Sequence, residues 1–441
     1  MYTADDASRL IDRRMALARE WDALVGEIRS ADGFRDFLRT PRLADLTSAA
    51  ADGPVAVINI SSVRCDALLL TVDGVEVVPL PELSAEVVSE RVGAYLKALG
   101  SVQDTALKLH GSQRGADPRS RDAARDLAAA SAAFDMARAD RESALAELAR
   151  WLWDTTAAPV LGKLGLTAAP ADGRPRPRLW WCPTGPLTLL PLHAAGHHPA
   201  PGAARGASSD SVLDVAVSSY TPTLRALVEA RHKPSTPAGH PDDSASDRLL
   251  IVAVPQAPGV VPLAEVDRER RHLAGLFPDR HTLLLGESAS RRSVLEHLPR
   301  HRWAHFSCHG TQNLADPSSG GVVLPDGILT VADISSRQYL NDFAFLSACK
   351  TATGGSSLPD EAITLAAAMH YTGYRHVIAT QWSVLDSAAA DVAESVYAYL
   401  TASGTFKTED SAYALHHAIT DCRDRRGWPL SWWSPFTHTG P

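Results

Sequence analysis

The sequence predicts an α/β protein: a mostly parallel sheet with helices on both faces, preceded by a helical segment and a second strand-containing half. Strands and helices alternate from residue 249 onward, which is typical of a parallel sheet covered by its own connections. Residues 54–81 carry two β-rich runs around Asp73-Gly74, the turn signal of a hairpin. Helical patterns fill residues 3–49 and the Ala-rich stretch 120–153.

Shifts in composition divide the chain into four parts. Residues 1–50 form an N-terminal helical segment, and 51–235 form a half that combines strands with long helices. Pro, Gly, Ser and Asp crowd residues 236–248, which we interpret as a linker. Residues 249–441 then form the α/β domain, whose length suits a single core.

The α/β domain is expected to contain five strands, with helices between and after them. Each strand candidate is a short, nearly continuous apolar run, as expected for strands buried on both faces. Residues 320–330 predict a small hairpin outside this sheet. The predicted strands are 249–254, 281–285, 303–308, 343–348 and 376–382, and the predicted helices are 263–277, 290–298, 360–373, 386–402 and 408–424.

Composition excludes several classes of function. The formal net charge is −8 and no run of Lys or Arg forms a basic patch, which argues against a nucleic-acid partner. The five cysteines are irregularly spaced and make a poor disulfide framework, so we expect a reducing compartment. No signal core and no apolar run near the ~18–20 residues of a membrane span is present, which predicts a cytoplasmic protein. No phosphate-binding loop occurs, so no cofactor is expected.

Two motifs at strand ends carry the candidate chemistry. His309-Gly310 follows the run WAHFSC, and Cys349 follows the run FAFLSA. In parallel sheets, functional groups collect just beyond the carboxyl ends of the strands. An imidazole and a thiol brought together there can act as base and nucleophile, because a thiol attacks only after it loses its proton. Gly310 offers an unobstructed backbone N–H to a developing oxyanion.

Each of these residues also has a simpler interpretation. A cysteine that ends an apolar strand is by default a packing residue, and a lone histidine near a turn is usually a hydrogen-bonded one. Cys308 should point to the opposite face of its strand from its neighbours and belong to the core. No partner at metal-ligand spacing accompanies Cys308 and His309, so no metal site is predicted. The cluster of His193, His197 and His198 is interpreted as an exposed loop.

The ordered set HFSCHG, FLSACKTA, DEAITLAAAMHYTGYRHVIATQWSVLD and SWWSPFTHTGP resembles the CHAT domain, a branch of the caspase and separase clan of cysteine peptidases. The resemblance implies a caspase-like fold and a Cys–His dyad, Cys349 with His309, without an obligatory carboxylate. It also implies that the backbone N–H groups of Gly310 and Cys349 form the oxyanion hole. The upstream half would be a degenerate pseudo-peptidase scaffold, with strands at 55–60, 66–72, 178–182 and 213–220. The tetratricopeptide repeats that often precede this domain are not found in the chain.

Three residues are candidates for binding the substrate. Arg- and Lys-specific relatives place an acidic residue two positions before the cysteine, where this chain has Ser347. Separase-like members instead use an aspartate after a Trp-containing strand, which corresponds to Asp386. The favoured interpretation of Asp386 is the simpler one, a cap or first-turn carboxylate of the following helix. An apolar pocket lined by Trp382 and Ala348 would suit Leu- or Met-like residues instead.

The resemblance thus implies a cysteine endopeptidase acting on a protein substrate, with an activating protein partner and no nucleic acid or membrane. Bacterial members of the family serve in antiviral defence and regulated cell death, some by cleaving gasdermin-like proteins. Two alternatives stay open from the residues alone. One is a catalytically idle scaffold or adaptor, and the other is a non-peptidase cysteine hydrolase.

Overall fold

The computed structural model describes residues 4–31, 37–39, 41–115, 121–170, 174–198, 210–232, 247–313, 315–348, 351–352 and 364–441. The chain forms two compact units, residues 1–48 and 49–441. The first unit contains helices α1 (Ala4–Ser30) and α2 (Leu43–Leu46). The candidate site residues named above all lie in the second unit.

The second unit is organised around a single sheet of eleven strands. The strand order is β3-β2-β1-β4-β5-β14-β13-β12-β8-β6-β7, and all neighbours are parallel except β1–β2, β2–β3 and β13–β14. β5 lies beside β14, so the strands of the two halves join edge to edge. The strands are β1 (Val55–Asn59), β2 (Asp66–Thr71), β3 (Gly74–Pro79), β4 (Arg178–Pro183), β5 (Val217–Tyr220), β6 (Leu249–Ala253), β7 (His281–Leu285), β8 (Trp303–Ser307), β12 (Phe343–Ser347), β13 (His376–Thr380) and β14 (Phe436–Thr439).

A small second sheet is formed directly after β8. Its order is β11-β10-β9, with both pairs antiparallel. The strands are β9 (His309–Thr311), β10 (Gly321–Leu324) and β11 (Gly327–Thr330). The hairpin predicted at 320–330 therefore lies outside the main sheet, as expected, and its partner strand carries His309.

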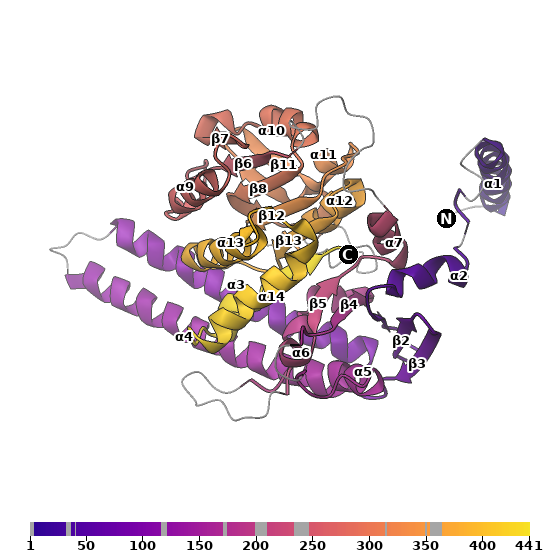
Figure 1. The fold of residues 1–441 in the computed structure, drawn as a ribbon, viewed down its shortest axis with the longest axis horizontal. Helices are drawn as coiled ribbons and strands as arrows, with labels where there is room; N and C mark the ends of the chain where they lie inside the picture. The colour runs from indigo at the N-terminus through magenta and orange to yellow at the C-terminus, as the bar shows by residue number, and fades with distance from the viewer. Residues whose placement is uncertain are drawn as a thin grey trace. The chain divides into compact units, whose positions relative to one another are not determined.

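Helices cover both faces of the main sheet, which confirms the predicted fold class (Figure 1). On one face, α9, α13 and α14 pack with the long antiparallel pair α3 and α4 over the largest core cluster. On the other face, α10, α11 and α12 cover the strands of residues 249–441, and α7 covers those of the first half. These helices are α3 (Ala85–Gly115), α4 (Arg121–Leu152), α7 (Leu224–His232), α9 (Val266–Leu276), α10 (Arg291–His297), α11 (Val331–Ser335), α12 (Leu365–Thr372), α13 (Asp386–Thr401) and α14 (Ser411–Asp424); the short ones are α5 (Ala158–Lys163), α6 (Val212–Val215) and α15 (Leu430–Trp433).

Side chains along the strands alternate strictly between the two faces. In β12, Phe343 and Phe345 enter the core beneath α9 and α13, while Ala344, Leu346 and Ala348 enter the core beneath α12. Successive residues of a strand point to opposite faces, so a strand buried on both faces has no polar position to interrupt its apolar run. The five strands predicted for this sheet in residues 249–441 were accordingly located within two residues from the sequence.

Two predictions about the strands need correction. The strand expected at 213–220 begins only at Val217, because residues 212–215 form the short helix α6. Ser211 and Arg423 both hydrogen-bond the side chain of Asp214 within this turn, and Arg423 is distant in sequence. The strand β14 was not anticipated at all, although it joins the two halves of the sheet.

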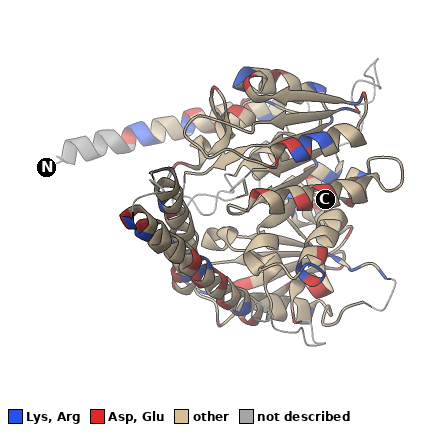
Figure 2. Ribbon diagram, turned by 90° about the vertical axis from the view of Figure 1, so that its left-hand side faces the viewer, with Lys and Arg blue, Asp and Glu red and all other residues tan. Residues whose placement is uncertain are grey.

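Charges of both signs are interspersed along the described helices (Figure 2). This distribution agrees with the absence of a basic run in the sequence. None of the helices in the described ranges is both long and apolar enough to cross a membrane.

Candidate active site

The carboxyl ends of β6, β8, β12 and β13 lie at one edge of the main sheet, because these neighbouring strands are all parallel. In β8 and β12, Ser307 is the register partner of Ser347. His309 and Cys349 each follow this last pair by two residues. Cys349 itself lies outside the described residues. The strand pairing predicted for the two motifs is therefore present up to two residues before each motif begins.

The chain on both sides of Cys349 is anchored at the end of β13. The carbonyl oxygen of Ala348 accepts hydrogen bonds from Thr380 Oγ1, at 3.0 Å, and from Thr351 Oγ1, at 3.1 Å. The N–H of Ala352 donates to the carbonyl of Thr380 at 2.8 Å. Residues 348 and 351–352 are thus held against the neighbouring strand.

His309 is half-buried and its ring has a backbone partner. Its Nε2 lies 2.6 Å from the carbonyl oxygen of Val261, in the segment between β6 and α9. A carbonyl can only accept, so Nε2 carries the proton, and in the neutral ring Nδ1 is then the basic nitrogen. A backbone carbonyl thus fixes the imidazole in a form that can take a proton through Nδ1. Gly310 follows in β9, opposite Val322 of β10.

Ser347 belongs to a buried hydrogen-bond network centred on Glu269 of α9. The Ser347 hydroxyl donates to Glu269 Oε1 at 2.7 Å, and the Ser307 hydroxyl donates to Oε2. His305 Nε2 lies 3.3 Å from the same Oε2, and the hydroxyl of Tyr397 lies 3.3 Å from His305 Nδ1. Ser347, expected to contact substrate, therefore holds a carboxylate beneath the strand ends.

Asp386 is the first residue of α13 and is half-buried. Its Oδ2 accepts a hydrogen bond from the backbone N–H of Glu265 at 2.7 Å, so it tethers the start of α9 rather than capping its own helix. Burial raises the pKa of Asp386, and the negative charges of Glu269 and Glu265 act in the same direction, although the hydrogen bonds oppose them. Contact with a basic substrate side chain stays a prediction for this residue.

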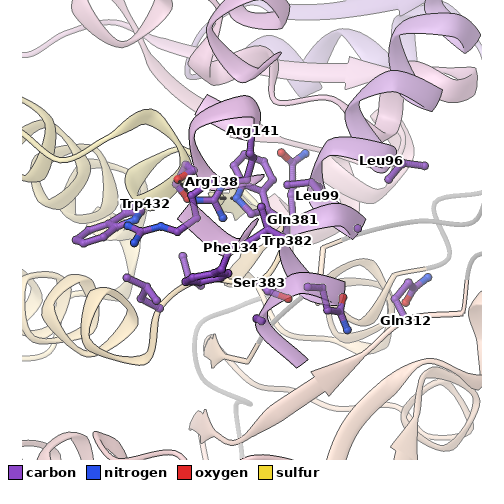
Figure 3. A pocket seen from close by; sticks show the side chains of 17 residues that line it. Leu96, Leu99, Phe134, Arg138, Arg141, Gln312, Gln381, Trp382, Ser383 and Trp432 are labelled. Atoms are coloured by element: carbon purple, nitrogen blue, oxygen red, sulfur yellow. Dashed lines mark hydrogen bonds between the residues drawn. The ribbon is translucent and has the colours of Figure 1, made fainter. Parts of the chain in front are cut away.

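Trp382 lines a cavity of about 450 Å³ beside the carboxyl end of β13 (Figure 3). The Trp382 ring is buried, and its Nε1 donates to the carbonyl of Ser431 at 3.2 Å. Ala348 does not share this cavity, since it is buried in the core on the other face of the sheet. The walls come from α3, α4, the segment after β13 and α15, and they include Leu96, Leu99, Phe134, Val384 and Trp432.

Several polar side chains also line this cavity. Gln381 precedes Trp382, and Gln312 follows the strand that carries His309. Arg141 donates to Ser431 Oγ at 2.6 Å, and burial lowers its pKa although Glu142 opposes the shift. The cavity therefore offers mainly apolar surface, next to the sheet edge where the two motifs end.

The remaining candidates take structural positions. Cys308 is buried in the core beneath α12, as expected. His193 does not lie in an exposed loop: it is buried, its ring bonds Tyr220 and the carbonyl of Ser434, and burial lowers its pKa to about 4. In the described part of the chain, no group of His, Cys, Asp and Glu could hold a metal ion.

The structure adds two groups to this edge that sequence reasoning missed. Glu269 and the carbonyl of Val261 contact residues 36 or more positions away in the chain. The only local signal for Glu269 is an acidic residue on the otherwise apolar face of an amphipathic helix. A backbone carbonyl leaves no signal in a sequence.

Comparisons with known proteins agree with this architecture. The CHAT domain family model matches residues 146–441. Among solved structures, the separase–securin complex of Saccharomyces cerevisiae is similar, with a TM-score of 0.56 at 10% identity over 90% of this chain and 31% of the separase chain. A second structure of that complex gives a TM-score of 0.55. The chain thus spans under a third of the separase chain that it matches. A search of curated protein sequences found no match.

Proposed function

Because the chain belongs to the CHAT family, we propose that it is a cysteine endopeptidase that cleaves protein substrates, with Cys349 as nucleophile and His309 as its base. The pairing of Ser307 with Ser347 carries the proposal. It makes the strands that lead to His309 and Cys349 direct neighbours in register, and each residue follows the last bonded pair by two positions. Proton transfer needs such proximity, about 2.6–3.2 Å between heavy atoms when substrate is bound.

The ring orientation of His309 supports the role of base. The Val261 carbonyl holds the Nε2 proton, which leaves Nδ1 to accept the thiol proton and later return it to the leaving amine. The backbone carbonyl serves as the third group, so no carboxylate is required. Gly310 and Cys349 would supply backbone N–H donors to the oxyanion, a contribution worth ~10²–10³ in rate per donor.

The cavity beside Trp382 supports a preference for apolar residues near the scissile bond. A large apolar side chain of the substrate would bury itself against Leu99, Phe134 and Trp432. Burying such a side chain stabilises a complex by ~1.5–3 kcal/mol. We retain a basic preference through Asp386 as the competing possibility, although its carboxylate already accepts from Glu265.

The cellular role follows only from the family. We place the enzyme in the cytoplasm, where an activating protein partner would keep proteolysis in check. Its candidate substrates are the gasdermin-like proteins of bacterial defence and regulated cell death. The solved separase structure contains the protein partner securin, which makes control by a bound protein a reasonable expectation for this fold.

A peptide-library experiment tests the proposal. Wild type, Cys349→Ala and His309→Ala are each incubated with a diverse peptide library, and the products are read by mass spectrometry. Cys308→Ala is the matched control, because it removes a buried thiol next to His309. We expect cleavage by wild type and Cys308→Ala alone.

Other outcomes would point elsewhere. Cleavage by Cys349→Ala would refute the assigned nucleophile. If neither wild type nor any variant cleaves a peptide, with or without candidate activators, a catalytically idle scaffold or adaptor would be favoured. Hydrolysis of small thioesters or esters by wild type without any peptide cleavage would favour a non-peptidase cysteine hydrolase.

A further inference from the structure

The buried carboxylate of Glu269 bonds the last residues of two central strands at once. Ser347 donates to Oε1 and Ser307 donates to Oε2, and these serines are register partners at the ends of β12 and β8. Glu269 is only 3% exposed. Beyond this pair the described chain leaves the main sheet, since His309 already pairs with Val323 in the small sheet. Glu269 therefore bonds the last residue pair that joins β8 and β12.

The surrounding network fits a Glu269 carboxylate that is the acceptor in each of its hydrogen bonds. If the Tyr397 hydroxyl donates to His305 Nδ1, then His305 Nε2 carries the proton and donates to Glu269. Both His305 and Tyr397 are fully buried. Among the described residues, His305 is the ion-pair partner within 4 Å of Glu269, and no Lys or Arg is. A buried carboxylate without a full cationic partner is costly unless it is fully hydrogen-bonded, so its position is tightly determined.

We propose that Glu269 is a positioning residue that sets the spacing between His309 and Cys349. The inference rests on the proposed function. Both residues follow the bonded serines by only two positions in the chain. A displacement of the strand ends would therefore also displace His309 and Cys349. Misplacement of reacting groups by ~1 Å can cost ~10²-fold in rate.

The fold offers a matched control at the other end of the same strands. Asp342 immediately precedes β12, is also 3% exposed, and bonds Arg302, which precedes β8. Glu269→Gln and Asp342→Asn each neutralise one buried carboxylate that links these two strands, at opposite edges of the sheet. A purely structural role predicts similar effects of the two substitutions on activity, whereas positioning predicts that only the first changes catalysis.

The test combines peptide kinetics with a measurement that needs no substrate. For each variant we measure kcat, KM and the pH midpoint of Cys349 alkylation by iodoacetamide, read by mass spectrometry. For Glu269→Gln we expect kcat to fall about 10- to 100-fold with KM within about 3-fold, and the midpoint to rise toward the ~8.5 of a free thiol. Asp342→Asn should lower the thermal midpoint but leave kcat and the alkylation midpoint unchanged.

Ser307→Ala and Ser347→Ala keep the inference testable if Glu269→Gln does not fold. Each substitution removes one of the hydrogen bonds to Glu269, so each should lower kcat by less than Glu269→Gln does. The loss of kcat in the double variant should not exceed the loss in Glu269→Gln. Wild-type kcat and alkylation midpoint in Glu269→Gln would overturn the proposal, as would an equal loss of kcat in Asp342→Asn. If wild type cleaves no peptide, the proposed function fails, while an alkylation midpoint that differs between wild type and Glu269→Gln still supports the positioning role.

Discussion

Acidification should weaken the junction between the two halves of the sheet, because two uncharged histidines are buried there. His376 of β13 and His438 of β14 are fully buried, with Nδ1 of the first 3.1 Å from Nε2 of the second. His438 Nδ1 lies 2.7 Å from Ser219 Oγ in β5, which in turn accepts from Arg178 in β4. Burial lowers the pKa of both histidines well below the usual value, and nearby positive charge, including that of Arg178, acts in the same direction.

The direction and size of the effect follow from these shifts. Below pH ~6.5 the unfolded chain binds a proton at each histidine and the folded chain does not, so the free energy of unfolding falls as the pH falls. Between pH 7.5 and 5.5, each histidine that stays neutral in the folded state accounts for a loss of about 1.4 kcal/mol. The pair accounts for about 3 kcal/mol, a large part of the ~5–15 kcal/mol that stabilises a typical domain.

Urea unfolding at pH 7.5 and 5.5, followed by tryptophan fluorescence, measures the loss. His438→Gln keeps a polar side chain at the site but cannot be protonated, so its loss should be smaller than that of wild type by about 1.4 kcal/mol. His232→Gln, at an exposed position in α7, is the control and should behave as wild type. Other titrating groups contribute equally to all three proteins. An equal loss in wild type and His438→Gln would refute the reasoning.

Two further substitutions test the packing and the cavity. Gly373→Ala should lower the free energy of unfolding by several kcal/mol, since φ is +132° and an added Cβ would lie 1.7 Å from the carbonyl oxygen of Tyr339. Gly404 has a φ of +83° but open space around it, so Gly404→Ala should lower the thermal midpoint far less than Gly373→Ala does. Leu99→Ser should raise KM for peptides with a large apolar residue by roughly 3- to 10-fold, whereas Leu107→Ser, exposed on the same helix, should not. A KM unchanged by Leu99→Ser would remove the cavity from the binding site.

The sequence predicted those parts of the fold whose signals are local. The apolar runs of β6, β8 and β12 are buried on both faces, so their boundaries could be located closely. The strand β14 reads FTHT, in which one apolar residue is followed by three polar ones, so it offers no apolar run. Its polar side chains are buried only because β5 and β13 flank it, and Ser219 and His376 meet His438 there. That environment arises from tertiary pairing and cannot be read locally.

The same distinction applies to the candidate site. The positions of His309 and Cys349 at strand ends could be proposed from the order of runs and turns. The partners of His309, Ser347 and Asp386 could not, since each is a group 48 or more residues away. Specificity was therefore argued from single positions, and the structure gives Ser347 and Asp386 intramolecular partners instead.

Residues 249–441 should not fold independently, although composition predicts a domain boundary before residue 249. The largest core cluster includes residues of both halves, among them Trp181 and Leu213 from the first and Phe345 and Phe436 from the second. Isolation of 249–441 would expose this surface and remove β5 from one side of β14, and an exposed strand edge favours aggregation.

We therefore expect the fragment 249–441 to bind a hydrophobic dye and to lack a cooperative urea transition. The fragment 49–441 is the matched control: it removes only the separate N-terminal unit and should unfold as cooperatively as the full chain. A native near-UV circular dichroism spectrum from 249–441 alone would contradict this reasoning. The expected result would mean that the first half forms part of the core beneath the strands that lead to His309 and Cys349.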